Sequence, residues 1–355
     1  MLRIVISVLI LAGSLLPAHA DDEPTRLFRS DEPITIRFEG PIRQIVRDMQ
    51  APDPKPYPAT LQLAGESPET LPITLTPRGN SRRDRETCRF PPLRVRFPEK
   101  PGKSSLFRKQ KSIKLVVHCK DSRAYEQYVL LEYLAYRLFN VITPQSLNVR
   151  LARIEYVNDD NGRTLTERWG FFIEDIDDMA DRIGRKEVEI PDIDIVMLDP
   201  EAAARVSVFQ YMIGNLDWSV VSGSGDDPCC HNGKLVGDPD ALINLIPVPY
   251  DFDFSGLVDT AYAAPPSRFK LRSVRDRKYR GFCNYTEQTR AAIALFQERE
   301  QALLAEIDQI TDLSDSQKGK ARRYIESFFK DIATPERAER NILNACRTRT
   351  AQSPN

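Results

Sequence analysis

The feature that most constrains the fold is the spacing of apolar residues in the first part of the chain. Between Ile34 and Val117, apolar and polar residues alternate in short bursts that prolines and charged turns separate. The bursts are Ile34/Ile36/Phe38, Leu61/Leu63, Ile73/Leu75, Leu93/Val95/Phe97 and Ile113/Leu115/Val117. A period of two is typical of strands with one buried and one wet face, so this region is predicted to form an antiparallel sheet.

Helical spacing first appears after these strands. Leucines recur at helical intervals within Arg123–Phe139, and we expect Asp121 to cap this helix. Two further strand-like segments, Leu147–Val157 and Thr164–Ile173, are joined at Asn161-Gly162, a pair that favours a tight hairpin. The N-terminal part is therefore predicted to be β-rich with one helix.

The C-terminal part is predicted to be mostly helical. Asp199-Pro200 is a start signal for a helix that runs to Ile213. Two short apolar segments, Lys234–Val236 and Leu242–Val248, then predict a hairpin. Helical spacing dominates from Thr286 onward, with further start signals at Ser314/Gln317 and Thr334-Pro335. We expect an α+β fold with two lobes, residues 21–174 and 175–355, and a ligand cleft between them.

The first twenty residues are typical of an export signal. Arg3 supplies a positive start, Ile4–Leu16 is an apolar run of 13, and Ala18-His19-Ala20 offers a small-x-small cleavage site. A membrane anchor is the alternative, but crossing a bilayer takes roughly 20 apolar residues. We expect the mature chain to begin at Asp21, to be secreted or periplasmic, and to have no membrane span after signal removal.

The chain has six cysteines, an even number in a compartment where disulfides form. Fifteen complete pairings are possible, and we favour Cys88 with Cys119 because both lie close to strand-like segments. Cys229, Cys230 and His231 together suggest a metal site, but adjacent cysteines lack the CxxC spacing that grips an ion from one turn. A disulfide is the preferred interpretation there.

The overall charge excludes binding to nucleic acid or acidic lipid by bulk electrostatics. The chain has 50 Lys and Arg against 51 Asp and Glu, a formal net charge of −1. One local exception is the basic stretch Arg268–Arg280, with Phe269 and Tyr279 among its cations. It is either a solvated positive face or a docking site for an acidic or phosphorylated partner.

Acidic and amide side chains recur at predicted loop ends in the C-terminal part. Asp217 follows a helix, Asn232 closes the next loop, and Asp251 and Asp253 follow the predicted hairpin. Phosphoryl transfer needs one carboxylate to position or deprotonate the attacking hydroxyl, together with oxygen ligands that hold magnesium against phosphates. This ordered set is a candidate for that chemistry.

Candidate phosphate-binding cations lie in the N-terminal part. Arg78 and Arg82 flank a Gly-Asn-Ser turn at a strand-to-loop junction, and Lys114 lies on a strand, on the face opposite its apolar neighbours. Glu132, in the following helix, is the expected ion-pair partner of Lys114, with Glu126 as the alternative. Spacing does not decide between the two glutamates.

The ordered combination of these motifs resembles the atypical protein-kinase-like fold of the spore coat protein H (CotH) group, and its Gly-Asn-Leu-Asp loop is similar to that of HipA-type kinases. The resemblance covers roughly residues 73–256. It implies a bilobal kinase-like fold and an ATP-dependent phosphotransferase with Asp217 as the catalytic aspartate. It also implies that Asn232 and Asp251 are magnesium ligands, with Asp253 a further one. Arg78, Arg82, Lys114 and Glu132 would then lie on the nucleotide side.

Two functional hypotheses follow from the sequence. The first is an exported kinase-like phosphotransferase that uses ATP and magnesium on a protein or envelope hydroxyl. The second is a non-catalytic exported binding protein that uses the same cleft for a metal ion or an anion. A serine hydrolase has little support, because no Gly-x-Ser-x-Gly elbow is present.

Overall fold

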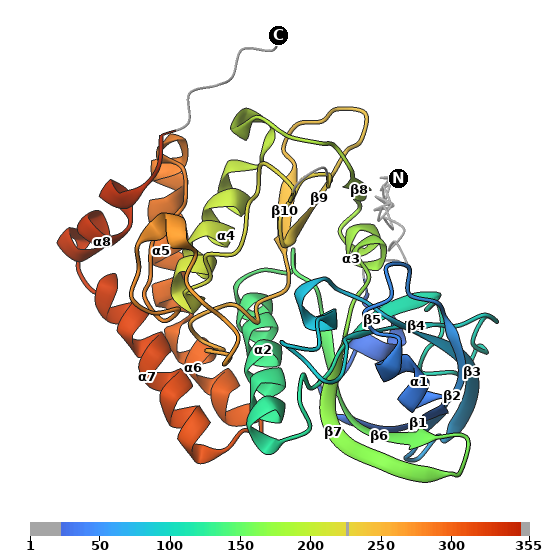
Figure 1. The fold of residues 1–355 in the computed structure, drawn as a ribbon. Helices are drawn as coiled ribbons and strands as arrows, with labels where there is room; N and C mark the ends of the chain where they lie inside the picture. Colours follow the sequence, from blue (N-terminus) through green and yellow to red (C-terminus); the bar gives the residue numbers. More distant parts are fainter. Residues whose placement is uncertain (1–22, 225–226, 349–355) are drawn as a thin grey trace, which may run out of the picture.

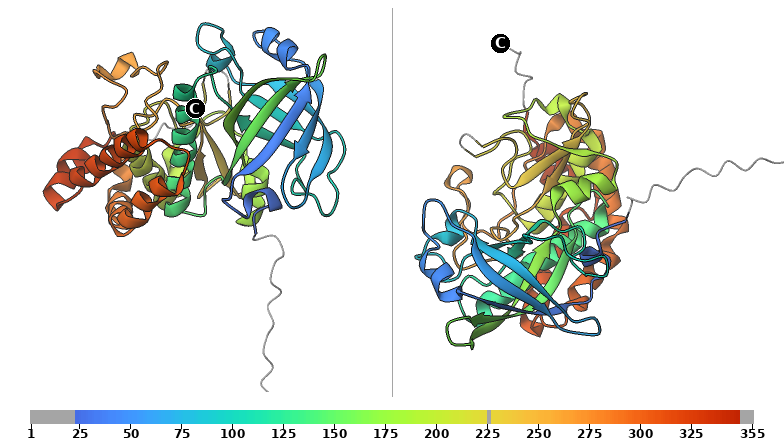
Figure 2. Two further views of the ribbon diagram at one scale, coloured as in Figure 1. Left: turned by 90° about the horizontal axis from the view of Figure 1, so that it is seen from below. Right: turned by 90° about the vertical axis from the view of Figure 1, so that its right-hand side faces the viewer.

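The computed structural model describes residues 23–224 and 227–348, so the predicted export signal lies outside the described residues. The chain forms a mixed α+β fold, which confirms the expected class. A β-barrel built from the first part of the chain lies beside a mostly helical part built from the second (Figure 1). The two parts remain side by side when the molecule is turned (Figure 2).

Seven strands close into a barrel in the order β1-β2-β3-β4-β5-β7-β6. They are β1 (Ile34–Gly40), β2 (Tyr57–Leu63), β3 (Glu69–Pro77), β4 (Leu93–Arg96), β5 (Ser112–Val116), β6 (Val149–Asn158) and β7 (Arg163–Ile173). Antiparallel pairing holds around the barrel except between β1 and β6, which run parallel. The alternating pattern located the strands, but it carried no information on this closing pair, because edge pairing is a non-local contact.

The barrel interior holds its own hydrophobic core. Phe38, Leu75, Leu115, Ile154 and Phe172 are fully buried there. Each such side chain stabilises the fold by about 1.5–3 kcal/mol relative to its exposed state. A short helix, α1 (Ile42–Arg47), adds two more apolar side chains to the same core. Since neighbours on a strand point to opposite faces, residues adjacent to these point out of the barrel.

Helix α2 (Arg123–Ile142) joins the barrel to the helical part and is buried along much of its length. Its Tyr136 ring lies 5.5 Å from Phe171 of β7. Its Phe139 ring lies 4.5 Å from Phe209 of α4 (Pro200–Ile213) on the other side. Because α2 packs on both parts, it fixes their relative position and so the shape of the space between them.

The predicted cap of α2 is wrong. The residue that precedes the first turn is Ser122, which has an extended backbone. Asp121 lies one residue further out, where its carboxylate pairs with Arg168 at 2.7 Å and accepts a hydrogen bond from Thr166. The charge-assisted contact with Arg168 occupies the Asp121 carboxylate, so the carboxylate does not cap the first turn of α2.

The helical part surrounds α4 and carries a small second sheet, in the order β10-β9-β8 (Figure 1). Its other elements are α3 (Ile176–Arg182), β8 (Lys186–Val188), β9 (Gly233–Gly237), β10 (Ile246–Pro249), α5 (Thr286–Glu298), α6 (Glu300–Gln309), α7 (Asp315–Asp331) and α8 (Pro335–Asn341). The expected helix starts are confirmed: the side chains of Asp199, Ser314 and Thr334 each accept a hydrogen bond from the first turn of their helix.

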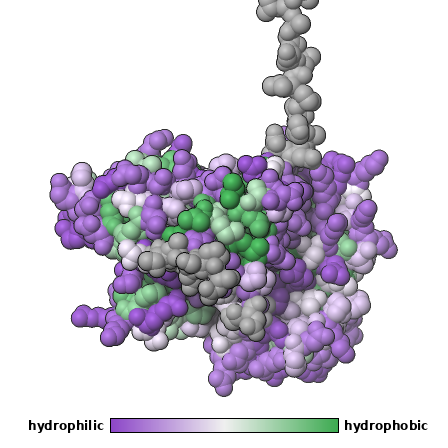
Figure 3. All heavy atoms as spheres, turned by 90° about the horizontal axis from the view of Figure 1, so that it is seen from above, coloured by the Kyte–Doolittle hydropathy of each residue, from purple (hydrophilic) through white to green (hydrophobic). Residues whose placement is uncertain are grey.

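Three disulfides tie the chain together: Cys88–Cys119, Cys229–Cys230 and Cys283–Cys346. The preferred pairing of Cys88 with Cys119 is confirmed, as is a disulfide rather than a metal site at the adjacent cysteines. Among the residues that the structure describes, no helix has the length and apolar character needed to cross a membrane. The face seen from above is largely hydrophilic, with hydrophobic residues grouped near its centre (Figure 3).

Candidate functional site

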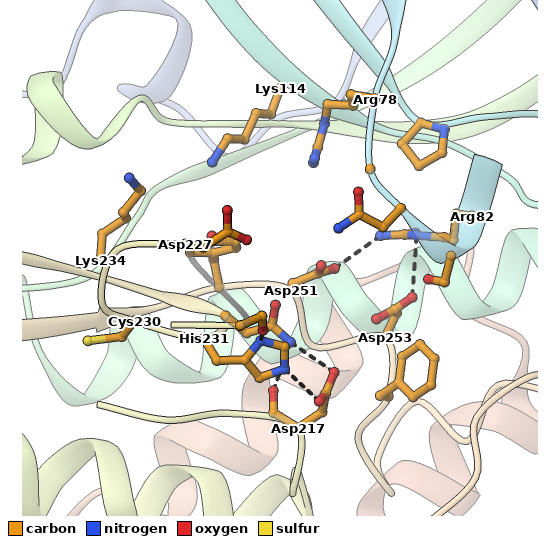
Figure 4. A pocket seen from close by; sticks show the side chains of 18 of the residues that line it. Arg78, Arg82, Lys114, Asp217, Asp227, Cys230, His231, Lys234, Asp251 and Asp253 are labelled. Atoms are coloured by element: carbon orange, nitrogen blue, oxygen red, sulfur yellow. Dashed lines mark hydrogen bonds and ion pairs between the residues drawn. The ribbon is translucent and has the colours of Figure 1, made fainter. Parts of the chain in front are cut away.

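A cavity of about 560 Å³ opens between the barrel and the helical part, and the predicted site residues meet there (Figure 4). Seven of the eight line it: Arg78, Arg82, Lys114, Asp217, Asn232, Asp251 and Asp253. The eighth, Glu132, lies behind the wall and contacts Arg82. Arg78 and Asp253, which are 175 positions apart in the sequence, thus line the same ligand-sized cavity.

Asp217 is placed by the sharp end of α4. Gly214 stops the helix in the left-handed conformation, with φ of 65°, and a Cβ there would lie 2.0 Å from the Tyr324 hydroxyl oxygen. Glycine is therefore required by both backbone and packing. The next residues turn into a loop in which the Asp217 amide donates to the Asn215 side chain at 2.9 Å. This loop points the Asp217 carboxylate into the cavity.

Two neighbouring side chains hold the Asp217 carboxylate. His231 Nε2 lies 2.7 Å from Oδ1, and Asn232 Nδ2 donates to Oδ2 at 3.0 Å. Burial by itself would raise the pKa of Asp217, but the hydrogen bonds from His231 and Asn232 outweigh it and keep that pKa below its usual value. The hydrogen bond to Asp217 in turn raises the pKa of His231. Asp217 is therefore an oriented, ionised carboxylate.

Asn232 has its amide end fixed. Its Nδ2 donates to the backbone carbonyl of Asp217 at 2.7 Å as well as to the carboxylate. An amide whose nitrogen is fully engaged keeps its carbonyl oxygen for another ligand. The backbone of Asn232 is left-handed, with φ of 51°, a conformation that favours Asn among residues with a side chain.

Asp251 stands just beyond β10 in a similarly special conformation. Its φ is 63°, and its backbone amide donates to the Tyr136 hydroxyl of α2 at 2.9 Å. The next residue, Phe252, is fully buried, with its ring 4.6 Å from Tyr136 and 5.4 Å from Phe209. The buried phenylalanine anchors the turn, so that the carboxylate before it faces the cavity.

Arg82 is the centre of a buried ionic cluster. Its guanidinium lies 3.5 Å from Glu132, 3.1 Å from Asp251 and 3.3 Å from Asp253. The expected ion pair between Lys114 and Glu132 is therefore wrong, because Arg82 takes Glu132. The alternative glutamate, Glu126, pairs with Arg153 at 2.7 Å. The planar guanidinium reaches three carboxylates at once, which an ammonium at the end of a flexible chain does less well.

Burial shifts the pKa of two acidic groups in this cluster, Glu132 and Asp253. Burial raises the pKa of Glu132 to about 8, although Arg82 works against the rise. Burial likewise raises the pKa of Asp253 to about 6. The Oδ2 atom of Asp253 is held by Arg82 and also accepts from the Tyr262 hydroxyl at 3.0 Å. Asp253 thus faces Arg82 and Tyr262.

Arg78 and Lys114 line the barrel side of the cavity and point toward its centre (Figure 4). No ion pair joins either cation to a carboxylate within residues 23–224 and 227–348. Burial, together with the nearby Arg78, lowers the pKa of Lys114 to about 8. The Lys114 ammonium lies 4.5 Å from the centre of the Tyr250 ring. Two half-buried cations that form no ion pair among the described residues suit an anionic ligand.

Sequence reasoning missed several residues of this site. The sequence suggested His231 only as part of a metal site with Cys229 and Cys230. Its position directly before the candidate ligand Asn232 was the one signal that could have placed it in the cavity. Lys234 also lines the cavity but is paired with Glu187 at 2.6 Å and Glu189 at 3.2 Å. Tyr136 had no signal beyond the apolar stripe of α2, because its contact with Asp251 is tertiary.

The oxygen donors fit magnesium held together with phosphates. Within the described ranges, no group of three or more His, Cys, Asp and Glu side chains is arranged to hold a metal ion. Magnesium, however, commonly takes one or two protein oxygens and completes its shell with water and substrate phosphates. Asp251 uses only Oδ1 on Arg82, and Asn232 keeps its carbonyl oxygen, so the two residues would supply that number of ligands to a bound magnesium ion.

Comparison with protein-family models and with curated proteins finds no match for this chain.

Proposed function

We propose that the protein is a magnesium-dependent phosphotransferase that moves the terminal phosphate of ATP to a hydroxyl group. The observation that carries the proposal is the pairing of two walls in one cavity. Arg78 and Lys114, which form no ion pair in the part of the chain that the structure describes, face Asp217 and Asp251 across the cavity. Asn232 lies beside Asp217 and donates a hydrogen bond to its carboxylate. A cation wall suits a triphosphate, and the opposite wall suits its metal and the attacking hydroxyl.

Each side chain takes a defined part in this proposal. Arg78 and Lys114 bind the phosphates, while Asn232 and Asp251 supply the magnesium ligands. Bound magnesium would neutralise charge on the phosphate oxygens. Asp253 and Glu132 hold Arg82, which holds Asp251, so we assign them to positioning rather than to metal binding.

Asp217 orients the acceptor and receives its proton. In the transfer, the acceptor oxygen forms a bond to the terminal phosphorus of ATP, the bond from that phosphorus to the bridging oxygen breaks, and ADP leaves. The hydroxyl proton passes to Asp217, whose carboxylate is held in place by His231 and Asn232. This arrangement resembles the kinase-like expectation from the sequence.

We further place the protein outside the cytoplasm. Three disulfides support this location, because such bonds persist in oxidising compartments. The N-terminal signal pattern agrees with it.

ADP formation from magnesium-ATP tests the enzymatic function. We expect the oxidised wild-type protein to form ADP and Asp217→Asn to lose at least roughly 100-fold in rate, with ATP affinity retained. Asp240→Asn, at an exposed turn between β9 and β10, serves as the matched control. ATP binding without any ADP formation by the wild type would favour the alternative, a binding protein that uses the same cavity to recognise anions.

A further inference from the structure

A second cavity of about 650 Å³ meets the first at Asp217 and His231. Ser224 also lines both spaces. The second cavity, which we call the arginine cavity, lies on the far side of the Asp217 loop and is lined by Arg268, Arg280 and Arg347. The two spaces therefore share one carboxylate, as a two-substrate transfer requires.

Arg280 is a buried residue that lines the arginine cavity. It is only 7% exposed, and its Nη1 donates to the carbonyls of Leu216 at 2.8 Å and Trp218 at 2.6 Å. These two carbonyls flank Asp217, so Arg280 braces the catalytic loop from the side of the arginine cavity. The rest of its guanidinium is left to line the cavity.

Neither Arg268 nor Arg280 forms an ion pair with a carboxylate in the described part of the chain. Burial lowers the pKa of Arg280 to about 9, and the neighbouring Arg347 and Arg268 add to the effect. Among the described lining residues, the arginines outnumber the one carboxylate, Asp217, so an anionic ligand would be stabilised in this cavity.

The lining of this cavity also includes several hydroxyl groups. Ser219, Ser222 and Ser224 line the cavity, and the first two lie 3.1 Å apart at their oxygens. Serine hydroxyls both donate and accept, which suits a ligand with several hydroxyl groups. The volume is that of a small-molecule site rather than of an extended groove for a peptide.

We propose that the arginine cavity binds the acceptor, and that the acceptor is a small hydroxyl compound with an anionic group, such as a phosphorylated or carboxylated sugar. The assignment rests on the proposed phosphotransferase function, since it takes Asp217 as the group that receives the acceptor's proton. Arg268 and Arg280 bind the anion, the serines bind hydroxyls, and one hydroxyl is presented to Asp217.

Calorimetric titration without ATP tests this site separately from catalysis. The probes are glucose 6-phosphate, glucuronate and neutral glucose. We expect at least one charged sugar to bind and glucose not to bind. Arg268→Ala should weaken binding roughly tenfold or more, and Arg268→Lys should restore part of it. Binding of the phosphate sugar alone identifies a phosphate site, and binding of both identifies a general anion site.

Two variants control for the other cavity and for surface charge. Arg272→Ala removes an exposed arginine of the same segment that lines neither cavity, and it should bind like the wild type. Lys114→Met should weaken ATP binding but leave sugar binding unchanged. Arg280→Lys, at the buried position, should weaken sugar binding with the fold retained by circular dichroism.

The proposal is overturned if neither charged sugar binds, if glucose binds equally well, or if Arg268→Ala binds like the wild type. Loss of sugar binding in Lys114→Met would place the ligand in the first cavity and also overturn it. If an acidic serine-containing peptide binds in an Arg268-dependent way and neither sugar does, the acceptor is a protein rather than a small molecule, and the proposal is overturned. Failure of ADP formation together with Arg268-dependent sugar binding would reject only the phosphotransferase function.

Discussion

His231 Nε2 lies 2.7 Å from Asp217 Oδ1, at the point where the two cavities meet. The other ring nitrogen of His231 contacts the Ser224 hydroxyl. The contacts from Ser224 to His231 and from His231 to Asp217 hold the Asp217 carboxylate in place. The carboxylate still lines both cavities, where an acceptor can reach it. His231 is therefore a positioning residue in the proposed reaction, since it acts on the acceptor through Asp217.

Replacement of His231 should change the pH dependence of the reaction. In His231→Ala, burial still raises the pKa of Asp217 but one of the two opposing hydrogen bonds is lost and only that from Asn232 remains, so the acidic limb of the pH–rate profile should move to higher pH. The rate at neutral pH should fall roughly 10- to 100-fold, because the carboxylate loses its orientation. His231→Asn, which can still donate, should recover part of the rate. An unchanged acidic limb in His231→Ala would contradict this role.

Lys114 should make ATP binding depend on pH. Because burial and nearby cations lower the pKa of Lys114 to about 8, the free protein has a neutral amine above that pH and must take up a proton to bind phosphate. ATP affinity should then fall by up to about tenfold per pH unit above pH 8. Lys114→Arg should remove this decline, because arginine stays protonated. The check is a series of ATP titrations from pH 7 to 9.5.

The size of the Lys114 contribution is separately measurable. Lys114→Met should weaken ATP binding roughly 10- to 100-fold, as expected for a lost charge-assisted contact. Lys111→Met, at an exposed position just before β5, is the control and should bind ATP normally. Equal affinities for the two variants would count against Lys114 as a phosphate ligand.

Arg82 should be a major contributor to stability. Arg82→Met removes the cation that holds Asp251, Asp253 and the buried carboxyl group of Glu132, and should lower the free energy of unfolding by about 3–5 kcal/mol. The exposed Arg89→Met should change it by less than about 0.5 kcal/mol. Denaturant unfolding of both variants checks the difference. A stability loss in Arg82→Met no larger than that of the control would show that the cluster is not held by the guanidinium.

Glu132 should make stability fall as pH rises. Its folded pKa of about 8 lies above the ordinary value of 4.5, so between these values the folded state keeps a proton that the unfolded state has lost. The contribution of Glu132 is complete below pH 4.5 and is lost as pH rises to 8. Glu132→Gln should therefore show a smaller drop in unfolding free energy from pH 5 to pH 8 than the wild type. An equal drop would mean that Glu132 does not carry this dependence.

The disulfides should differ in their effects on stability. The Cys88–Cys119 bond spans 31 residues, and its replacement by two serines should cost about 3–4 kcal/mol by chain entropy. Replacement of Cys229 and Cys230 by serines should cost less, because the bond joins adjacent residues and closes no loop. Thermal unfolding of both double variants gives the comparison. A larger loss for the adjacent pair would show that the bond stabilises the loop in another way.

Local patterns were enough to predict most elements of the fold. The alternation that placed Leu115 inside the barrel also placed Lys114 outside it, toward the cavity. The start signal at Asp199 worked because a cap depends on residues within one turn. The parallel pairing of β1 with β6 was not predictable in this way, since it joins Ile34 to Ala152 through tertiary closure.

For the site, too, the sequence predicted local placement but not tertiary contacts. The sequence placed Asp217, Asn232 and Asp251 at loop ends, and they meet in one cavity. It offered Glu132, with Glu126 as the alternative, as the partner of Lys114, because a strand lysine and a glutamate of the following helix were the visible pair. The structure gives Glu132 to Arg82, whose position depends on how the short 3₁₀ turn Ser81–Arg83 packs against α2. Partner choice among charges is a tertiary property that spacing does not contain.

Magnesium dependence of ATP binding tests the central claim most directly. ATP is titrated into the oxidised protein with and without magnesium chloride, for the wild type and for Asp251→Asn. The account predicts that magnesium tightens ATP binding to the wild type by at least roughly tenfold and has little effect on Asp251→Asn. Absence of ATP binding by the wild type, or equal affinity with and without magnesium, would contradict it.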